Sequence, residues 1–312
     1  MGQELWQIVV NPAAGGGRVR EQRQEIQTDL RKAGVVFEWN ESEGPMHAVE
    51  LVKAMIQAGY RHLAVVGGDG SLNEVINGIF SQDEVPGTEI KLAVIPAGTG
   101  GDFARMYGIR SLEHGIRLLH EHKALIQDVG VAHWKTDQGT QHRYFGNVAG
   151  LAFDAFITDD TADMNKAGWR GLVTYLWAVL RNLWRYEQEE LALVMENRNW
   201  REVTILANAG ICRHNGGGMN LVPWADPQDG RFDISLVKSL SPLQVLLNIA
   251  KLYNGKLYRH DRAFHERSKW LDIQSPTGLE VDGEYLGRGT GRLEVIEAAL
   301  KIAVPVAYKV AT

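Results

Sequence analysis

Cysteine is almost absent from this chain, since Cys212 is the only one among 312 residues. A single cysteine cannot form an intramolecular disulfide, which excludes a disulfide-stapled scaffold and fits a reducing compartment. The residues Met1 to Glu4 and those that follow them lack the basic segment and long apolar core of a signal peptide. We therefore expect a cytoplasmic location.

Long apolar runs and strong net charge are absent as well. No uncharged apolar stretch approaches the roughly 20 residues of a membrane span, so any membrane contact is expected to be peripheral. The net charge of −5 does not suggest a nucleic-acid partner. An apolar fraction of 45% is ordinary for a globular protein, and a length of 312 residues predicts two domains.

The first part of the chain alternates apolar runs with amphipathic segments. Strands are expected over residues 6–10, 35–39, 63–66 and 92–95. Helices are expected over residues 19–32, 46–58, 72–80, 101–107 and 111–122. This alternation predicts a doubly wound parallel α/β domain, which we place at residues 1–127.

From about residue 128 the pattern changes to short strands separated by turn residues. The expected strands are 129–134, 143–148, 191–195, 203–207, 232–237, 270–273 and 293–296. The predicted fold class is therefore α/β + β, with a mainly antiparallel, β-sandwich-like second domain at residues 128–312. One inserted helical segment carries Trp169, Trp177 and Trp184 interleaved with arginines. It either covers the β domain or lies at a membrane interface.

Three glycine-rich turns follow predicted strands of the first domain: residues 11–18, 67–71 and 98–103. The carboxyl ends of parallel strands meet at one edge of a sheet, where ligands bind. Glycine turns leading into helices present backbone N–H groups to phosphate. Asp69 in the second turn would repel that phosphate unless a cation lay between them, so these turns predict phosphate together with Mg²⁺.

Five motifs, in order, resemble the diacylglycerol kinase and sphingosine kinase catalytic family, in particular its compact bacterial lipid kinases. They are Asn11-Pro12 with Gly15 to Arg18, Ser42 to Ala48, Gly67 to Ser71, Gly98 to Ala104, and Val281 to Glu284. Three features depart from the family pattern: serine replaces threonine at positions 42 and 71, Gly101 replaces asparagine, and Met46 replaces a frequent glycine.

The resemblance implies ATP as the phosphoryl donor and Mg²⁺ as the catalytic cation. Asp69 and Asp102 are the expected Mg²⁺ ligands. The expected nucleotide-binding residues are Asn11, Gly16, Gly17, Ser42, Gly67, Gly68, Gly70, Ser71, Asn73, Glu74, Thr99 and Asp102. Asn73 has an alternative interpretation as an ordinary residue of the first helical turn.

The expected catalytic residues are Glu284, Asp282 and Asp69. Residues two apart share a face of a regular strand, so Asp282 and Glu284 are expected to lie side by side and to raise each other's pKa. The resemblance implies that one of them is the general base, and we favour Glu284. Taken alone, an Asp-Gly-Glu sequence is more often an exposed hairpin turn.

Two further loops are polar. Asp226, Asp229 and Arg231 lie in an aspartate-rich turn. By resemblance, the Asp229 carboxylate with the carbonyls of Asp226 and Arg231 would hold a structural Mg²⁺ or Ca²⁺; the alternative is a plain turn. The loop from His214 to Gly218 either lines a substrate entrance or reverses the chain.

The sequence is therefore interpreted as an ATP-dependent lipid kinase that phosphorylates a lipid hydroxyl, with diacylglycerol as the first candidate. Its expected partner is lipid at the inner face of a membrane, and a homodimer is a family-level expectation. One alternative is a soluble phosphotransferase of the NAD kinase type, which shares the Gly-Gly-Asp-Gly turn. Another is a non-catalytic nucleotide or lipid sensor that retains the fold.

Overall fold

A computed structural model describes residues 4–97, 101–166 and 179–308. The chain divides into two compact units, the first formed by Met1–Gln127 with Ala298–Thr312 and the second by Asp128–Glu297. The second unit therefore ends at Glu297, whereas the sequence predicted a second domain that continues to residue 312. The physical reason is strand pairing, because Lys301 and Ile302 lie parallel to Lys91 and Leu92 within the first unit.

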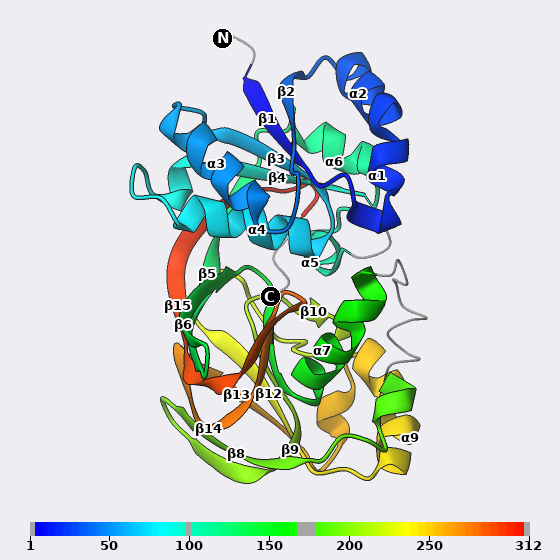
Figure 1. The fold of residues 1–312 in the computed structure, drawn as a ribbon, viewed down its shortest axis with the longest axis vertical. Helices are drawn as coiled ribbons and strands as arrows, with labels where there is room; N and C mark the ends of the chain where they lie inside the picture. The colour runs from blue at the N-terminus through cyan, green and yellow to red at the C-terminus, as the bar shows by residue number, and fades with distance from the viewer. Residues whose placement is uncertain (1–3, 98–100, 167–178, 309–312) are drawn as a thin grey trace. The chain divides into compact units, whose positions relative to one another are not determined.

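The first unit is built on a parallel sheet (Figure 1). Its strands, in spatial order, are β2 (Val36–Glu41), β1 (Leu5–Val10), β3 (His62–Gly67), β4 (Lys91–Pro96) and the end of β15 (Glu284–Ala303). Strands β1, β3 and β4 are almost entirely buried, as continuous apolar runs such as Leu63 to Val66 require when both faces are covered.

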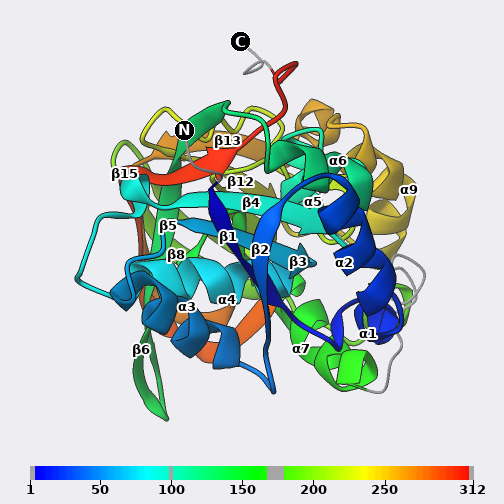
Figure 2. The ribbon, with the colours of Figure 1, turned by 90° about the horizontal axis from the view of Figure 1, so that it is seen from above.

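Helices cover the two faces of this sheet in separate groups. The helices are α1 (Arg18–Glu21), α2 (Arg23–Lys32), α3 (His47–Gln57), α4 (Asp69–Phe80), α5 (Asp102–Met106) and α6 (Leu112–Leu118). Helix α3 packs on α4, and α2 contacts α6. Figure 2 shows these pairs on opposite sides of the strands. Right-handed crossovers produce this arrangement when strand order reverses at β1, so the doubly wound fold is present.

The second unit is a mainly antiparallel sheet. Its strands are β5 (Ala124–Thr136), β6 (Gly139–Phe145), β7 (Val148–Ala152), β8 (Glu189–Met195), β9 (Asn199–Gly210), β12 (Phe232–Lys238), β13 (Ala263–Ser268), β14 (Trp270–Val281) and β15. The order β13-β12-β9-β7-β14-β15 runs across it, while β8 pairs with both β9 and β14. A small hairpin, β10 (His214–Asn215) and β11 (Met219–Asn220), lies outside this sheet.

Two expected elements differ in extent. The strand predicted over 143–148 is interrupted, because the amides of Gly146 and Asn147 bond to the Asp282 carboxylate rather than to a neighbouring strand. The strand predicted over 293–296 is part of the much longer β15. Gly289 and Gly291 lie on β15 where a side chain would collide with β5 carbonyls, so β15 shows no simple strand periodicity.

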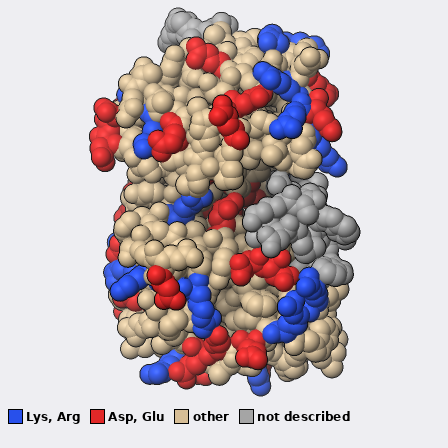
Figure 3. Space-filling model, in the orientation of Figure 1, with Lys and Arg blue, Asp and Glu red and all other residues tan. Residues whose placement is uncertain are grey.

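Two helices pack on the second unit's sheet, α7 (Phe153–Lys166) and α9 (Pro242–Tyr253). They join helical residues 179–182 around a core that includes Phe153, Ile157, Val179 and Leu183. No helix in the described part of the chain combines the length and apolar character needed to span a membrane. On the face drawn in Figure 3, acidic and basic side chains are interspersed.

Candidate functional site: a phosphate-binding edge and a carboxylate network

The expected nucleotide-binding turns gather at one edge of the first unit's sheet. Val10 lies in register with both Glu41 and Val66, and Gly67 lies opposite Pro96. The chain therefore leaves β1, β2, β3 and β4 at the same edge. The structure thus brings together the turns containing Gly16, Ser42 and Asp69, and β4 ends at the same edge.

The glycines of these turns have two distinct uses. Gly16 and Gly17 have φ of 75° and 92°, and no atom lies within 4 Å of where a Cβ would be. They leave an open backbone surface that a phosphate can approach. At Gly67, in contrast, a Cβ would lie 2.6 Å from Ser71 Oγ. Gly67 therefore allows β3 and α4 to pack closely.

Asp69 is the first residue of α4, and its carboxylate bonds to the start of α5. Its two oxygens accept the N–H groups of Asp102 at 3.0 Å and Phe103 at 3.1 Å. Burial raises the pKa of the Asp69 carboxyl, while these two N–H groups and the positive charge of Arg105 oppose that shift. Asp69 thus caps α5 and fixes the turn that leads to Asp102.

Asp102 lies beside Asp69, but several other expected nucleotide contacts are used within the protein. Glu74 accepts the amide of Ala48 at 3.2 Å, at the start of α3. Asn73 is fully buried, and its side-chain oxygen accepts from Asn77. Asn11 accepts the amide of Ala13. Asn73 therefore bonds within α4, and its role at a nucleotide stays a prediction.

The remaining members of the expected set have varied surroundings. Ser42 and Ser71 are buried, each 8% exposed, whereas Gly68 and Gly70 are partly exposed at the start of α4. Thr99 lies outside the described residues. Among the described residues, no cluster of three or more His, Cys, Asp or Glu side chains is placed to hold a metal ion. A Mg²⁺ at Asp69 and Asp102 would therefore also need phosphate oxygens or water as ligands.

In the second unit, Asp282 and Glu284 do not share the face of a strand, so that expectation was wrong. Asp282 and Gly283 form a two-residue hairpin turn between β14 and β15, with φ of 50° and 85°. Positive φ at both positions is the pattern of a type I′ turn. The right-handed twist of the two strands favours this turn, and it separates the two carboxylates.

The turn buries Asp282 and leaves Glu284 exposed. The Asp282 carboxylate accepts three backbone N–H groups, from Gly146 at 2.9 Å, Asn147 at 3.0 Å and Val148 at 3.2 Å. Bonds of this kind stabilise the ionised carboxylate and occupy its lone pairs. Asp282 therefore connects the hairpin to the segment between β6 and β7, and Glu284 is the more accessible carboxylate.

A buried network that the sequence did not predict joins this hairpin to α7. Glu280 is fully buried and accepts the Gly283 amide at 2.8 Å and the Asn215 side-chain amide at 2.8 Å. Asn215 also donates to Asp154 at 3.2 Å, and Asn208 donates to Asp154 at 2.7 Å. Burial, then the nearby Asp154 charge, raises the pKa of the Glu280 carboxyl well above its ordinary value.

Gly150 makes this network possible. In register, Gly150 of β7 lies between Glu280 of β14 and Asn208 of β9. A Cβ on Gly150 would lie 2.5 Å from oxygens of both Asp154 and Glu280. The only sequence signal was the loop from His214 to Gly218, since its glycines form the turn that holds Asn215.

An apolar cavity borders this network within the second unit. The cavity is partly open to solvent. Its lining is aliphatic and aromatic apart from Asp154 and Asn248; the other lining residues are Phe153, Val179, Ile205, Leu206, Met219, Leu221, Val237, Leu240, Val245, Ile249 and Leu252. Asp154 is the one carboxylate in this lining, and it connects the cavity to the buried network.

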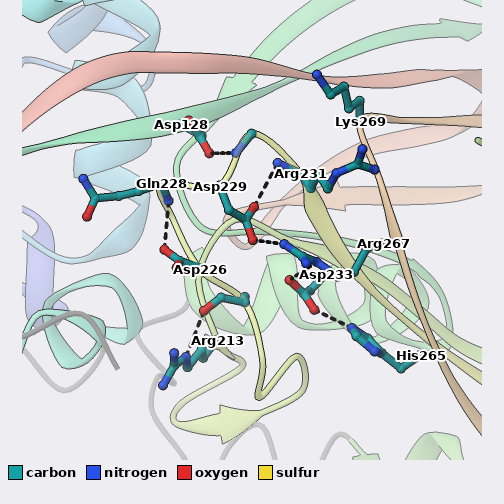
Figure 4. Close-up of polar contacts among 12 residues, drawn as sticks. Asp128, Arg213, Asp226, Gln228, Asp229, Arg231, Asp233, His265, Arg267 and Lys269 are labelled. Carbon is teal, nitrogen blue, oxygen red and sulfur yellow. Dashed lines mark hydrogen bonds and ion pairs between the residues drawn. The ribbon is translucent and has the colours of Figure 1, made fainter. Parts of the chain in front are cut away.

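The aspartate-rich turn lies elsewhere in the second unit (Figure 4). Asp229 pairs with the Arg267 guanidinium and accepts the Arg231 amide, while Asp226 accepts the Gln228 amide. Burial raises the pKa of the Asp229 carboxyl, and the positive charge of Arg267 opposes that shift. The guanidinium thus already supplies the positive charge that the predicted structural cation would provide.

Sequence comparison assigns both parts of the chain to known families. Residues 6–132 match the diacylglycerol kinase catalytic domain, and residues 148–304 match the YegS C-terminal NAD kinase beta sandwich-like domain. The chain belongs to the diacylglycerol kinase and YegS-like lipid kinase family. This membership indicates a lipid-kinase-like phosphotransferase.

Similar proteins extend over nearly the whole length. This lipid kinase is 26% identical to a diacylglycerol kinase of Mycobacterium tuberculosis, covering 95% of this chain and 94% of that protein. It is 30% identical to a Pseudomonas putida protein named "Probable lipid kinase YegS-like", over 89% of this chain and 88% of that protein. It superposes on the crystal structure of a diacylglycerol kinase from Bacillus anthracis with a TM-score of 0.71 at 19% identity. The superposition covers 99% of this chain and 100% of that one.

Proposed function

We propose that this protein is an ATP-dependent lipid kinase that transfers the γ-phosphate to the free hydroxyl of diacylglycerol and produces phosphatidic acid. In this reaction the lipid oxygen forms a bond to the γ-phosphorus, and the bond from that phosphorus to the ADP oxygen breaks. The hydroxyl proton passes to a carboxylate of the enzyme. Family membership supports the reaction class, and the arrangement of the second unit supports the substrate.

The observation that carries the substrate proposal is the connection between the apolar cavity and the carboxylate motif. Asp154 lines the cavity, and hydrogen bonds lead from it through Asn215 to Glu280 and on to the Gly283 amide. An acyl chain suits the apolar wall, and a hydroxyl-bearing headgroup suits the Asp154 carboxylate. The turn that carries Glu284 is thereby fixed relative to the place where such a headgroup would lie.

The proposed roles of individual residues follow from their surroundings. Gly16, Gly17 and the start of α4 offer backbone N–H groups to the nucleotide phosphates, and Asp69 and Asp102 are the candidate ligands of Mg²⁺. When bound, that cation would neutralise phosphate charge during transfer. Glu284 is the proposed proton acceptor because it is exposed, whereas the Asp282 oxygens already accept three amides.

The substrate also defines the expected location. Diacylglycerol resides in a bilayer, and no membrane-spanning helix is found among the described residues. We therefore propose a cytoplasmic enzyme that binds reversibly to the inner face of the membrane.

The alternative of an NAD kinase-type activity has one observation in its favour. The fold resembles that of yeast NADH kinase, with a TM-score of 0.50 at 11% identity over 98% of this chain and 84% of that one. That likeness concerns the fold alone. The cavity argues against a dinucleotide acceptor, because its lining offers only two polar residues.

A direct assay tests the proposal. Purified protein is incubated with γ-labelled ATP, Mg²⁺ and, in parallel, dispersed diacylglycerol, monoacylglycerol, a long-chain base, and NAD. We expect label in phosphatidic acid at a greater rate than in any other product, with Asp69→Asn as the inactive control. Label only in NADP would favour the NAD kinase alternative, and no transfer to any acceptor would favour the sensor.

A further inference from the structure

Helix α9 has apolar residues on two opposite faces, although no residue of it is fully buried. Its inner face contributes Val245, Leu246, Ile249 and Leu252 to the core shared with α7. Its outer face presents Leu243 and Leu247, which are 64% and 74% exposed and lie four residues apart. Burying one such leucine is worth about 1.5–3 kcal/mol, so water is a poor environment for this face.

The helix is nevertheless well defined at its start. Ser241 accepts the Gln244 amide, the Gln244 side chain accepts the Ser241 amide, and Pro242 occupies the first helical position. This capping box fixes where the helix begins. The outward direction of Leu243, in the first turn, is therefore determined by the fold rather than by fraying.

Other exposed apolar side chains belong to segments that pack beside α9. Leu180 and Trp184 are 44% and 66% exposed, in the segment whose Val179 and Leu183 share the α9 core. Trp224 is 51% exposed, and its ring lies tilted against that of Tyr258, just beyond the end of α9. Tryptophan is typical of the boundary between water and lipid.

The charges near this face are mainly positive. Residues 241–262 contain Lys251, Lys256, Arg259 and Arg262, and Asp261 is their only acidic residue, which gives 4 − 1 = +3 in a chain of net charge −5. On the neighbouring segment, Arg181 and Arg185 lie 3.9 Å and 3.6 Å from Asp160. Basic residues around an apolar face fit an anionic lipid surface.

We propose that the outer face of α9, formed by Leu243 and Leu247 with Leu180, Trp184 and Trp224 around it, docks on anionic membranes and delivers the lipid to the cavity. The inner face of the same helix lines that cavity through Val245, Ile249 and Leu252. A lipid leaving the bilayer therefore has to travel only about one helix diameter, roughly 10 Å, to reach the apolar wall.

A lipid surface fits this face better than a second copy of the chain. A two-fold symmetric dimer would place the same basic residues against each other, and like charges repel.

The test separates docking from catalysis, because this inference rests on the proposed function for the role of the cavity. Binding of the full chain to phosphatidylcholine–phosphatidylglycerol vesicles is measured by sedimentation without nucleotide. The variant is Leu243→Gln with Leu247→Gln. The matched control is Val36→Gln with Val306→Gln, two exposed valines of the first unit that are 41% and 67% exposed.

We expect vesicle affinity to fall about tenfold in the α9 variant, from the loss of apolar burial, and to be unchanged in the control. The melting temperature should stay within a few degrees of the wild type, because both leucines are exposed. Turnover on dispersed short-chain diacylglycerol should stay within about twofold. Turnover on vesicle-resident diacylglycerol should fall with vesicle affinity.

Three results would overturn the inference: wild-type vesicle affinity in the α9 variant, equal losses on dispersed and vesicle-resident lipid, or a dimer that the α9 variant converts to monomer with vesicle binding unchanged. Failure of the proposed function looks different. Vesicle binding that depends on Leu243 and Leu247, without phosphorylation of any lipid, would support the docking surface and contradict the lipid kinase proposal.

Discussion

Asp282 and Glu284 are only two residues apart, yet their surroundings are opposite. Asp282 is buried beneath three amide donors, and Glu284 is exposed on the first residue of β15. A carboxylate whose oxygens are occupied by donors is a poor proton acceptor, whereas an exposed one is accessible to substrate. At the residue scale, the motif therefore combines one positioning carboxylate with one candidate base.

Substitution should separate these two roles. We expect Glu284→Gln to lower kcat by at least about 10²-fold with little change in melting temperature, since it removes a base at an exposed position. We expect Asp282→Asn to destabilise the protein by about 1–3 kcal/mol, since one amide oxygen cannot satisfy three donors. Both quantities are read from turnover on dispersed lipid and from thermal unfolding. Full activity in Glu284→Gln would remove the base assignment.

Glu280 predicts a dependence of stability on pH. Its pKa is raised in the folded protein, so over the interval between its ordinary value and the raised value the folded state binds more protons than the unfolded state. Stability from this group is present below that interval and is lost as pH rises through it. Glu280→Gln, which stays neutral, should flatten this part of the profile.

The measurement is the melting temperature as a function of pH for wild type, Glu280→Gln and the control Glu25→Gln, which changes an exposed carboxylate of α2. The control should follow the wild type. An unchanged slope in Glu280→Gln would mean that Glu280 is already ionised in the folded protein.

At the scale of elements, an ion pair and a backbone hydrogen bond hold the turn between Asp226 and Phe232. Arg267 of β13 pairs with Asp229, and Asp128 of β5 accepts the Gly230 amide at 2.7 Å. These two contacts attach the turn to β13 and β5. The structural Mg²⁺ or Ca²⁺ expected there stays a prediction, and it would have to displace the Arg267 guanidinium.

This competition gives a test. Arg267→Gln frees the Asp229 carboxylate, so we expect added Ca²⁺ or Mg²⁺ to raise the melting temperature of Arg267→Gln more than that of the wild type. Asp229→Ala should melt at a lower temperature than the wild type and should not respond to either cation. If none of the three proteins responds to cations or to a chelator, the turn binds no metal.

At the scale of the whole molecule, the end of the last strand, β15, is part of the first unit. Ile302 is fully buried and lies opposite Leu92 of β4. We expect Ile302→Ala to destabilise the first unit by about 2–5 kcal/mol, the usual range for such a cavity. Hydrogen exchange should show lost protection in β4 and β3, while Val306→Ala, at an exposed position, should leave both protected. Protection lost only in the second unit would contradict the assignment of residues 298–312.

Much of this architecture could be predicted from the sequence, because its signals are local. Apolar runs such as Leu63 to Val66, followed by glycine turns, specify parallel strands and the edge at which these turns gather, without reference to distant residues. The network around Glu280 could not be predicted in the same way. Asp154, Asn208, Asn215 and Glu280 meet only after β7, β9 and β14 pair, and the residue that permits their approach, Gly150, carries no side chain.

The conformation of the acidic motif, residues 281–284, could not be predicted from the sequence either. Its residues are compatible with a strand or a turn, and the choice depends on amides at positions 146–148, which are more than 130 residues away in the chain. Resemblance located the motif, but pairing across the sheet decided which carboxylate is buried.

The return of residues 298–312 to the first unit also has a consequence for biosynthesis. The ribosome adds about 5–20 residues per second, so residues 128–297 take on the order of ten seconds or more to translate. During that time β4 has no strand on its outer side, and an unpaired parallel edge can pair with another chain. Nascent chains of this protein are therefore most prone to aggregate after residues 1–127 have emerged and before the final strand is made.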